Sequence, residues 1–133
     1  VRAFMNGLSE SPRESEVNVA LFREGYPPPI QQANVLDAHG YFIARPDFLF
    51  PEQSVALEYD GMGKLLGEYG MTPDTAAKKE RERERKLISE GVYPIRITKE
   101  SFASGLWLTE LHDVWGTRAP MRGDRWRGGG RAW

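Results

Sequence analysis

The chain of 133 residues contains no cysteine. A disulfide framework and a zinc site built on thiolates are therefore both excluded. Its two histidines, His39 and His112, lie far apart in the sequence and lack the spacing of a metal-ligand pair. No apolar run approaches the roughly 20 residues that span a bilayer, so no membrane association is predicted. The first residues also lack the basic and apolar regions of a secretion signal, and a cytoplasmic location is expected.

The charge is nearly balanced overall but unevenly distributed. Hydrophobic residues make up 40% of the chain and charged residues 28%, which is typical of one soluble globular domain. The net charge of −1 argues against a protein that coats nucleic acid. Residues 116–133, however, contain five arginines and one aspartate, so a basic tail follows an acidic body. That asymmetry is typical of nucleic-acid partners, but carboxylates gathered around a cation would also make the body acidic.

The spacing of apolar residues predicts an α/β domain. A capping box at Ser11-Pro12-Arg13-Glu14 begins the first helix, and Gly25 ends it. A hairpin turn is expected around residues 37–40. The predicted helices cover residues 12–24, 72–90 and 101–115, and the predicted strands cover residues 30–36, 40–49, 54–59 and 93–98.

The order α-β-β-β-α-β-α predicts three antiparallel strands, a crossover helix and a fourth strand. These elements would form a mixed four-stranded sheet flanked by helices. The predicted organisation is an extension at residues 1–10, a domain at residues 11–115 and a tail at residues 116–133. The tail is rich in glycine and arginine and is expected to be disordered.

Three carboxylates lie on the second and third predicted strands. Asp47 follows Pro46 on the second, whereas Glu58 and Asp60 end the third. Because side chains alternate along a strand, Glu58 and Asp60 point the same way, about 7 Å apart. Asp47 can face this pair if the two strands are antiparallel neighbours.

Carboxylates that share one face repel each other unless a positive charge lies between them. A hard divalent cation with oxygen ligands suits such a site, Mg²⁺ above all and Mn²⁺ as a substitute. The alternative is that the acids face solvent and that Asp60-Gly61 is an ordinary turn. The apolar run at residues 55–57 favours the metal site, because buried carboxylates are costly unless paired or metal-bound.

Several segments occur in a fixed order within residues 11–101. They are ES at 14–15, GYPPP at 25–29, ARPDFLFPE at 44–52, LEYDG at 57–61, Lys64, ERERE at 80–84, Leu87, Gly91 and RIT at 96–98. This series resembles an actinobacterial group of small endonuclease-like proteins, which are similar to very-short-patch-repair endonucleases within the PD-(D/E)XK superfamily. The resemblance implies a restriction-endonuclease-like fold and a Mg²⁺-dependent endonuclease that hydrolyses DNA phosphodiester bonds.

The resemblance also implies roles for individual residues. Asp47 resembles the first acid of the superfamily motif and Glu58 the second. Asp60 lies where the superfamily usually has a lysine, so it would be a third metal ligand or a base that positions water. Lys64 would supply the missing positive charge, or it is a solvated loop lysine. Glu14 would be a further acid directed into the site, or it serves the helix cap.

Basic residues in two regions are candidates for binding nucleic acid. The charged helix alternates in sign and forms either a solvated ion-paired face or a cleft lining in which Lys79, Arg83 and Arg96 meet phosphates. In the tail, residues 122–133 resemble arginine-glycine segments that bind single strands through charge and through stacking on Trp126 and Trp133. Arg125, Trp126 and Arg127 are the binding candidates in this segment. The alternative for the tail is a terminus without a role.

The leading hypothesis is therefore a Mg²⁺-dependent DNA endonuclease. The first alternative is a DNA-binding module of the same fold that has lost turnover, because the usual lysine is missing at position 60. The second is an interaction protein that binds no metal. A homodimer is open as well, since nucleases that cut both strands often dimerise.

Overall fold

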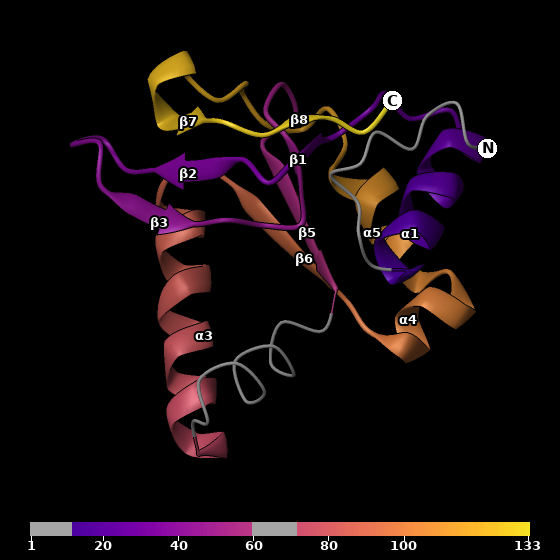
Figure 1. The fold of residues 1–133 in the computed structure, drawn as a ribbon, viewed down its shortest axis with the longest axis horizontal. Coiled ribbons are helices and arrows are strands. Elements are labelled where there is room, and N and C mark those ends of the chain that lie inside the picture. Colours follow the sequence, from indigo (N-terminus) through magenta and orange to yellow (C-terminus); the bar gives the residue numbers. More distant parts are fainter. Residues whose placement is uncertain (1–11, 60–71) are drawn as a thin grey trace.

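A five-stranded mixed sheet forms the centre of the molecule (Figure 1). The computed structural model describes residues 12–59 and 72–133. The strand order is β6-β5-β4-β1-β8. In that order the strands are Tyr93–Ile97, Val55–Tyr59, Phe48–Phe50, Ile30–Gln31 and Gly130–Arg131.

The pairing directions in the sheet match those expected from the sequence. β4 is antiparallel to β1 and to β5, whereas β5 and β6 are parallel. The long helix α3 (Pro73–Ser89) connects these two parallel strands. Its N-cap is Thr72, whose hydroxyl accepts a hydrogen bond from Thr75 N at 3.2 Å. The mixed α/β class is therefore confirmed, but the sheet has five strands rather than four because β8 joins the free edge of β1.

A second, three-stranded sheet was not predicted. Its order is β3-β2-β7, with bounds Phe42–Ala44, Asn34–Leu36 and Trp126–Arg127. Each of the first two predicted strands divides in two. Gln32 has a left-handed φ of 59°, which separates β1 from β2. Pro46 has no N–H for a ladder, and it separates β3 from β4.

The predicted hairpin turn between β2 and β3 is confirmed. Asp37 Oδ1 accepts hydrogen bonds from His39 N at 2.8 Å and from Tyr41 N at 3.0 Å. Gly40 has a φ of 85°, a conformation that favours glycine.

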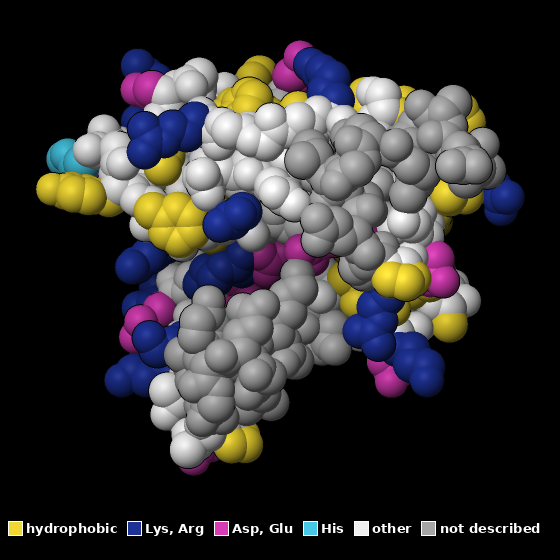
Figure 2. All heavy atoms as spheres, viewed as in Figure 1, with side chains coloured by type: hydrophobic (Ala, Val, Ile, Leu, Met, Phe, Trp, Pro, Cys, Tyr) yellow, Lys and Arg dark blue, Asp and Glu magenta, His cyan; other side chains and the backbone are white. Residues whose placement is uncertain are grey.

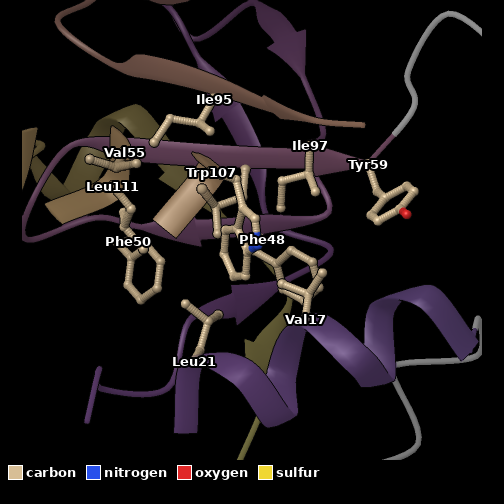
Figure 3. Close-up of a cluster of buried hydrophobic side chains, with 11 residues drawn as sticks. Val17, Leu21, Phe48, Phe50, Val55, Tyr59, Ile95, Ile97, Trp107 and Leu111 are labelled. Carbon is tan, nitrogen blue, oxygen red and sulfur yellow. The ribbon is translucent and has the colours of Figure 1, made fainter. Parts of the chain in front are cut away.

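One face of the central sheet carries most of the aromatic core (Figure 3). Helix α1 (Pro12–Arg23) places Val17 and Leu21 against Phe48 of β4. Helix α5 (Leu106–Val114) adds Trp107 and Leu111 to the same cluster. The first turn of α1 carries Glu14, but Ser11 of the predicted capping box lies outside the described residues.

The predicted helix at residues 101–115 is two helices. Gly105 has a φ of 78° and ends α4 (Lys99–Ser104) before α5 begins. Helix α4 starts earlier than predicted because Thr98 and Ser101 form a capping box. No helix in residues 12–59 and 72–133 is both long and apolar enough to cross a membrane.

The opposite face of the sheet is covered by α3 and by the small sheet. Leu87 of α3 packs there with Ala56 of β5, Leu49 of β4 and Val35 of β2. Side chains therefore alternate along β5, with Leu57 in the aromatic core and Ala56 under α3.

Residues 116–133 are folded, so the expectation of a disordered tail was wrong. The short helix η2 (Gly123–Arg125) is followed by β7, which pairs with β2, and by β8, which pairs with β1. Ala132 is fully buried and its N–H donates to Pro29 O at 2.9 Å. The ring of Trp133 meets that of Phe22 edge-on at 5.6 Å. Strand pairing and burial hold this segment in spite of its composition. The predicted extension at residues 1–10 lies outside the described residues.

Candidate active site

Asp47 and Glu58 lie on the same face of the sheet, at the end of β5. The register pairs Phe48 with Leu57, and one further antiparallel step places Asp47 opposite Glu58. Because Leu57 points into the aromatic core, Glu58 points to the face that α3 covers. The two acids therefore face each other across the ladder, as the sequence predicted.

The backbone of β5 orients the Asp47 carboxylate. Asp47 Oδ2 accepts a hydrogen bond from Tyr59 N at 2.9 Å. This hydrogen bond uses a side chain to extend the ladder between β4 and β5. Asp47 directly follows Pro46, where the second half of the predicted strand begins. The side chain of Asp47 is only half-buried, so the carboxylate is held in position beside solvent.

A cation from the protein itself occupies the position beside Glu58. Arg83 of α3 donates through both terminal nitrogens to the two oxygens of Glu58, a bidentate pair. The side chains are 22% and 14% exposed, so the pair is largely shielded from water. The guanidinium thus provides the positive charge that a carboxylate on this face requires.

The Arg83 pair belongs to a larger ion network under α3. Glu80, which is buried, lies 3.3 Å from Arg83 Nη1 and 2.9 Å from Arg96 Nη2. Arg96 also contacts Glu84 at 2.5 Å. Arg96 is the register partner of Glu58 on the parallel strand β6, so the network joins β5, β6 and α3.

Burial and neighbouring charges act in opposite directions on Arg83. Desolvation lowers the pKa of its guanidinium, and the negative charge of Asp47 is the largest influence that raises it. Asp47 therefore interacts electrostatically with Arg83, although Glu58 receives the hydrogen bonds. The arrangement is two facing carboxylates with one arginine serving both.

Acidic side chains are visible in a hollow near the middle of the molecule, with lysine or arginine side chains beside them (Figure 2). Within the described residues no group of three potential ligands among histidine, cysteine, aspartate and glutamate is close enough to hold a metal ion. Asp60, the predicted third ligand, and Lys64 both lie outside the described residues. The predicted trio is thus represented here by its first two members.

Glu14 lies in the first turn of α1, on the other side of the sheet from α3. This turn is close to the end of β5, because the guanidinium carbon of Arg13 lies 5.2 Å from the centre of the Tyr59 ring. The side chain of Glu14 is half-buried and interacts with other groups of the protein.

The predicted nucleic-acid-binding residues fall into two groups. Lys79 on α3 and Arg127 on β7 are exposed. The other four are half-buried, and three of these are arginines held in ion pairs. They are Arg83, Arg96, Arg125, which lies 2.7 Å from Glu90, and Trp126, which packs on the core under α3.

Sequence reasoning missed the pairing of Glu58 with Arg83 and the burial of Glu80. A signal for both was present in the charged helix. Ala76, Glu80, Arg83 and Leu87 recur at helical spacing, and Ala76 and Leu87 are the apolar ends of that stripe. A stripe with apolar ends and charged residues at its centre indicates a buried ion pair rather than a solvated face.

Comparison of the chain with protein-family models, with curated proteins and with solved structures finds no match. The site must therefore be interpreted from its own chemistry.

Proposed function

We propose that this protein is a divalent-cation-dependent nuclease that hydrolyses phosphodiester bonds of DNA. The observation that carries the proposal is the facing pair Asp47 and Glu58 with the guanidinium of Arg83 beside them. The succession α1-β1-β4-β5-α3-β6, in which β5 and β6 are parallel, is consistent with a restriction-endonuclease-like core. The hairpin β2–β3 would then be an insertion in that core.

The donor set fits a hard divalent cation such as Mg²⁺ or Mn²⁺. Asp47 and Glu58 offer carboxylate oxygens, the ligands that such ions prefer. Two facing carboxylates need a positive charge, and an arginine now supplies it. When bound, the ion polarises a phosphate and lowers the pKa of a bound water. Asp47 and Glu58 would hold it, with Asp60 as the third ligand or as the base that positions water.

Arg83 has a second role in this proposal. If Glu58 held a cation, the guanidinium of Arg83 would be available for a phosphate, whose oxygens match its fork. Arg83 would then neutralise charge where the superfamily usually has a lysine, together with Lys64. Glu14, from α1, stays a candidate for a further acid at the end of β5.

The direct test is nicking of supercoiled and branched DNA by the purified protein with Mg²⁺ or Mn²⁺. We expect cleavage by the wild type and its loss in Asp47→Asn, which keeps an oxygen for Tyr59 N but removes the charge. Asp113→Asn is the matched control, because Asp113 is exposed on α5. A wild type that cuts no better than Asp47→Asn would overturn the nuclease proposal.

One observation favours a second candidate, a DNA-binding module without turnover. Both oxygens of Glu58 are engaged by Arg83, and residue 60 is an acid rather than a lysine. This candidate predicts DNA retention in a gel-shift assay without nicking. The other alternative, an interaction protein that binds no metal, predicts no heat of binding in calorimetry with Mn²⁺.

A further inference from the structure

A cavity of about 320 Å³ opens at the other end of β5 from the candidate active site. Ser54, which precedes β5, lines it, and Ser54 and Glu58 are four residues apart along the strand, about 13 Å at the rise of an extended chain. The C-terminal end of α3, the segment before η2 and Arg125 of η2 form the remaining walls. The folding of residues 116–133 onto the domain therefore creates this cavity.

Within the part of the chain that the structure describes, three arginines line the cavity, Arg118, Arg122 and Arg125, against one carboxylate, Glu90. That carboxylate is already used, because Arg125 Nη1 donates to Glu90 Oε1 at 2.7 Å. The lining therefore carries an excess of positive charge, and such a cavity favours an anionic ligand.

Two of these arginines are held in position by the fold. Arg118 Nη1 donates to Gly91 O at 3.2 Å, and its guanidinium carbon lies 5.1 Å from the centre of the Tyr93 ring. Arg125 is fixed by Glu90. By contrast, the side chain of Arg122 is 77% exposed, and its Nε lies 3.7 Å from the exposed carboxylate of Asp124. This exposed pair is accessible to a ligand that approaches from solvent.

One donor in this cluster has no acceptor among residues 12–59 and 72–133. Arg125 Nε is buried and has no hydrogen-bond partner there, and Asp124 Oδ1 at 3.7 Å is too far for a hydrogen bond. A buried charged N–H without a partner is unfavourable, and such groups often mark the place of a water or an ion.

The wall of the cavity is built in a strained conformation. Ser54 has a φ of 58°, which is uncommon for a residue other than glycine. Its hydroxyl donates to Ala119 O at 2.5 Å, and Met121 N donates to Pro51 O at 2.8 Å. These bonds fix the arginine-bearing segment against the start of β5. Backbone strain that is kept in this way is typical of binding sites.

We propose that this cavity binds the phosphate monoester of a single nucleotide unit. Guanidinium groups match phosphate oxygens, and the volume is at the low end for small-ligand sites, too small for a duplex. A free nucleotide and the phosphorylated 5′ end of a strand share this chemistry. The proposal requires neither metal nor cleavage, so it is independent of the nuclease proposal.

Calorimetry and thermal shift in the presence of a chelator test the site. The probes are inorganic phosphate, a nucleoside 5′-monophosphate, and one oligonucleotide with either a 5′-phosphate or a 5′-hydroxyl. We expect saturable binding of the phosphorylated probes. A preference for the 5′-phosphorylated oligonucleotide over the monophosphate identifies a strand end, and equal affinity identifies a nucleotide. The absence of saturable binding by every phosphorylated probe would overturn the proposal.

Arg122→Gln is the decisive variant, because its exposed side chain can change without unfolding the protein. We expect at least about fivefold weaker binding, and a larger loss in Arg118→Gln/Arg122→Gln. Arg81→Gln removes the same charge from an exposed position on α3 and serves as the control. Unchanged affinity in Arg122→Gln, or an equal loss in Arg81→Gln, would contradict a site at this cavity.

Discussion

Arg83 connects the two strands of the candidate site to the helix above them. Its guanidinium pairs with Glu58, interacts with Asp47 and contacts the buried Glu80. A buried carboxylate that loses such a partner keeps the cost of its desolvation. A cation that binds in the site must therefore replace the positive charge that Glu58 loses when Arg83 moves away.

The substitution Arg83→Gln tests this competition. We expect the free energy of unfolding to fall by about 2 kcal/mol, since Glu58 and Glu80 lose a charged partner. Mn²⁺ should then stabilise the variant more than it stabilises the wild type, because the ion no longer has to displace a guanidinium. Urea unfolding with and without Mn²⁺ measures both effects. Arg81→Gln is the control, and equal stabilisation of variant and wild type by Mn²⁺ would argue against competition.

Asp37 gives a prediction about pH. The hydrogen bond from Tyr41 N, followed by that from His39 N, lowers the pKa of its carboxyl. A lowered pKa in the folded state means that the stabilisation is present above the ordinary value of about 3.9 and is lost as the pH falls below it. The stability difference between wild type and Asp37→Ala, from urea unfolding, should therefore narrow from about pH 6 to about pH 3. A constant difference would contradict this role for the carboxylate.

At the scale of elements, the packing of β8 depends on the turn that precedes it. A Cβ at Gly129 would lie 2.2 Å from Gln31 O and 2.8 Å from Ala33 N, whereas Gly128 would meet only Asn34 Nδ2 at 3.7 Å. Both glycines have a positive φ, 80° at Gly128 and 74° at Gly129. Substitutions at these two glycines therefore distinguish the free-energy cost of a strained backbone conformation from that of a steric clash.

We expect Gly128→Ala to lower the free energy of unfolding by about 1 kcal/mol through its φ alone. Gly129→Ala should lower it by a further 1–3 kcal/mol or so, because β1 must move away from β8. Chemical denaturation of both variants measures the difference. Equal effects of the two substitutions would mean that the turn does not pack against β1 in solution.

The same elements show how far sequence patterns reach. The helix of residues 12–24 and the charged helix were predicted to within about two residues, because glycine ends each of them and a proline opens each. The long strands were not, since a single left-handed residue, Gln32, sends β1 and β2 to different sheets. A local pattern does not show that break, because glutamine carries no preference for this conformation.

The tail and the site differ in a related way. The glycines and arginines of residues 116–133 resemble a disordered segment, and only their long-range partners β1 and β2 reveal two strands. The facing of Asp47 and Glu58 could be predicted, because strand alternation and antiparallel pairing suffice. Their pairing with Arg83 could not, since it depends on how α3 rotates over the sheet.

For the whole molecule, the exposed basic residues predict how the proposed DNA binding responds to salt. Each phosphate contact contributes about −0.9 to the slope of log K against log salt for duplex DNA. Lys79 lies on α3 and Arg127 on β7, and both are exposed. Lys79→Gln and Arg127→Gln should each reduce the magnitude of that slope by the contribution of about one contact. Arg23→Gln is the control, because Arg23 is exposed at the end of α1 on the opposite side of the sheet. Fluorescence anisotropy across a salt series measures the slopes, and values equal to that of the control would remove both residues from the interface.

The pairing of β1 with β8 has a consequence for how the chain reaches its native state. Ile30 and Arg131 are neighbours although roughly a hundred residues separate them. The entropy lost on closing such a loop rises only slowly with its length, so this separation in sequence has little effect on the free energy of unfolding. It has a larger effect on the folding rate, since non-local contacts form late and slow folding. Refolding should accordingly be slower than for a helical domain of this size, and the fluorescence of Trp133, beside Phe22, would report when the outer strand docks.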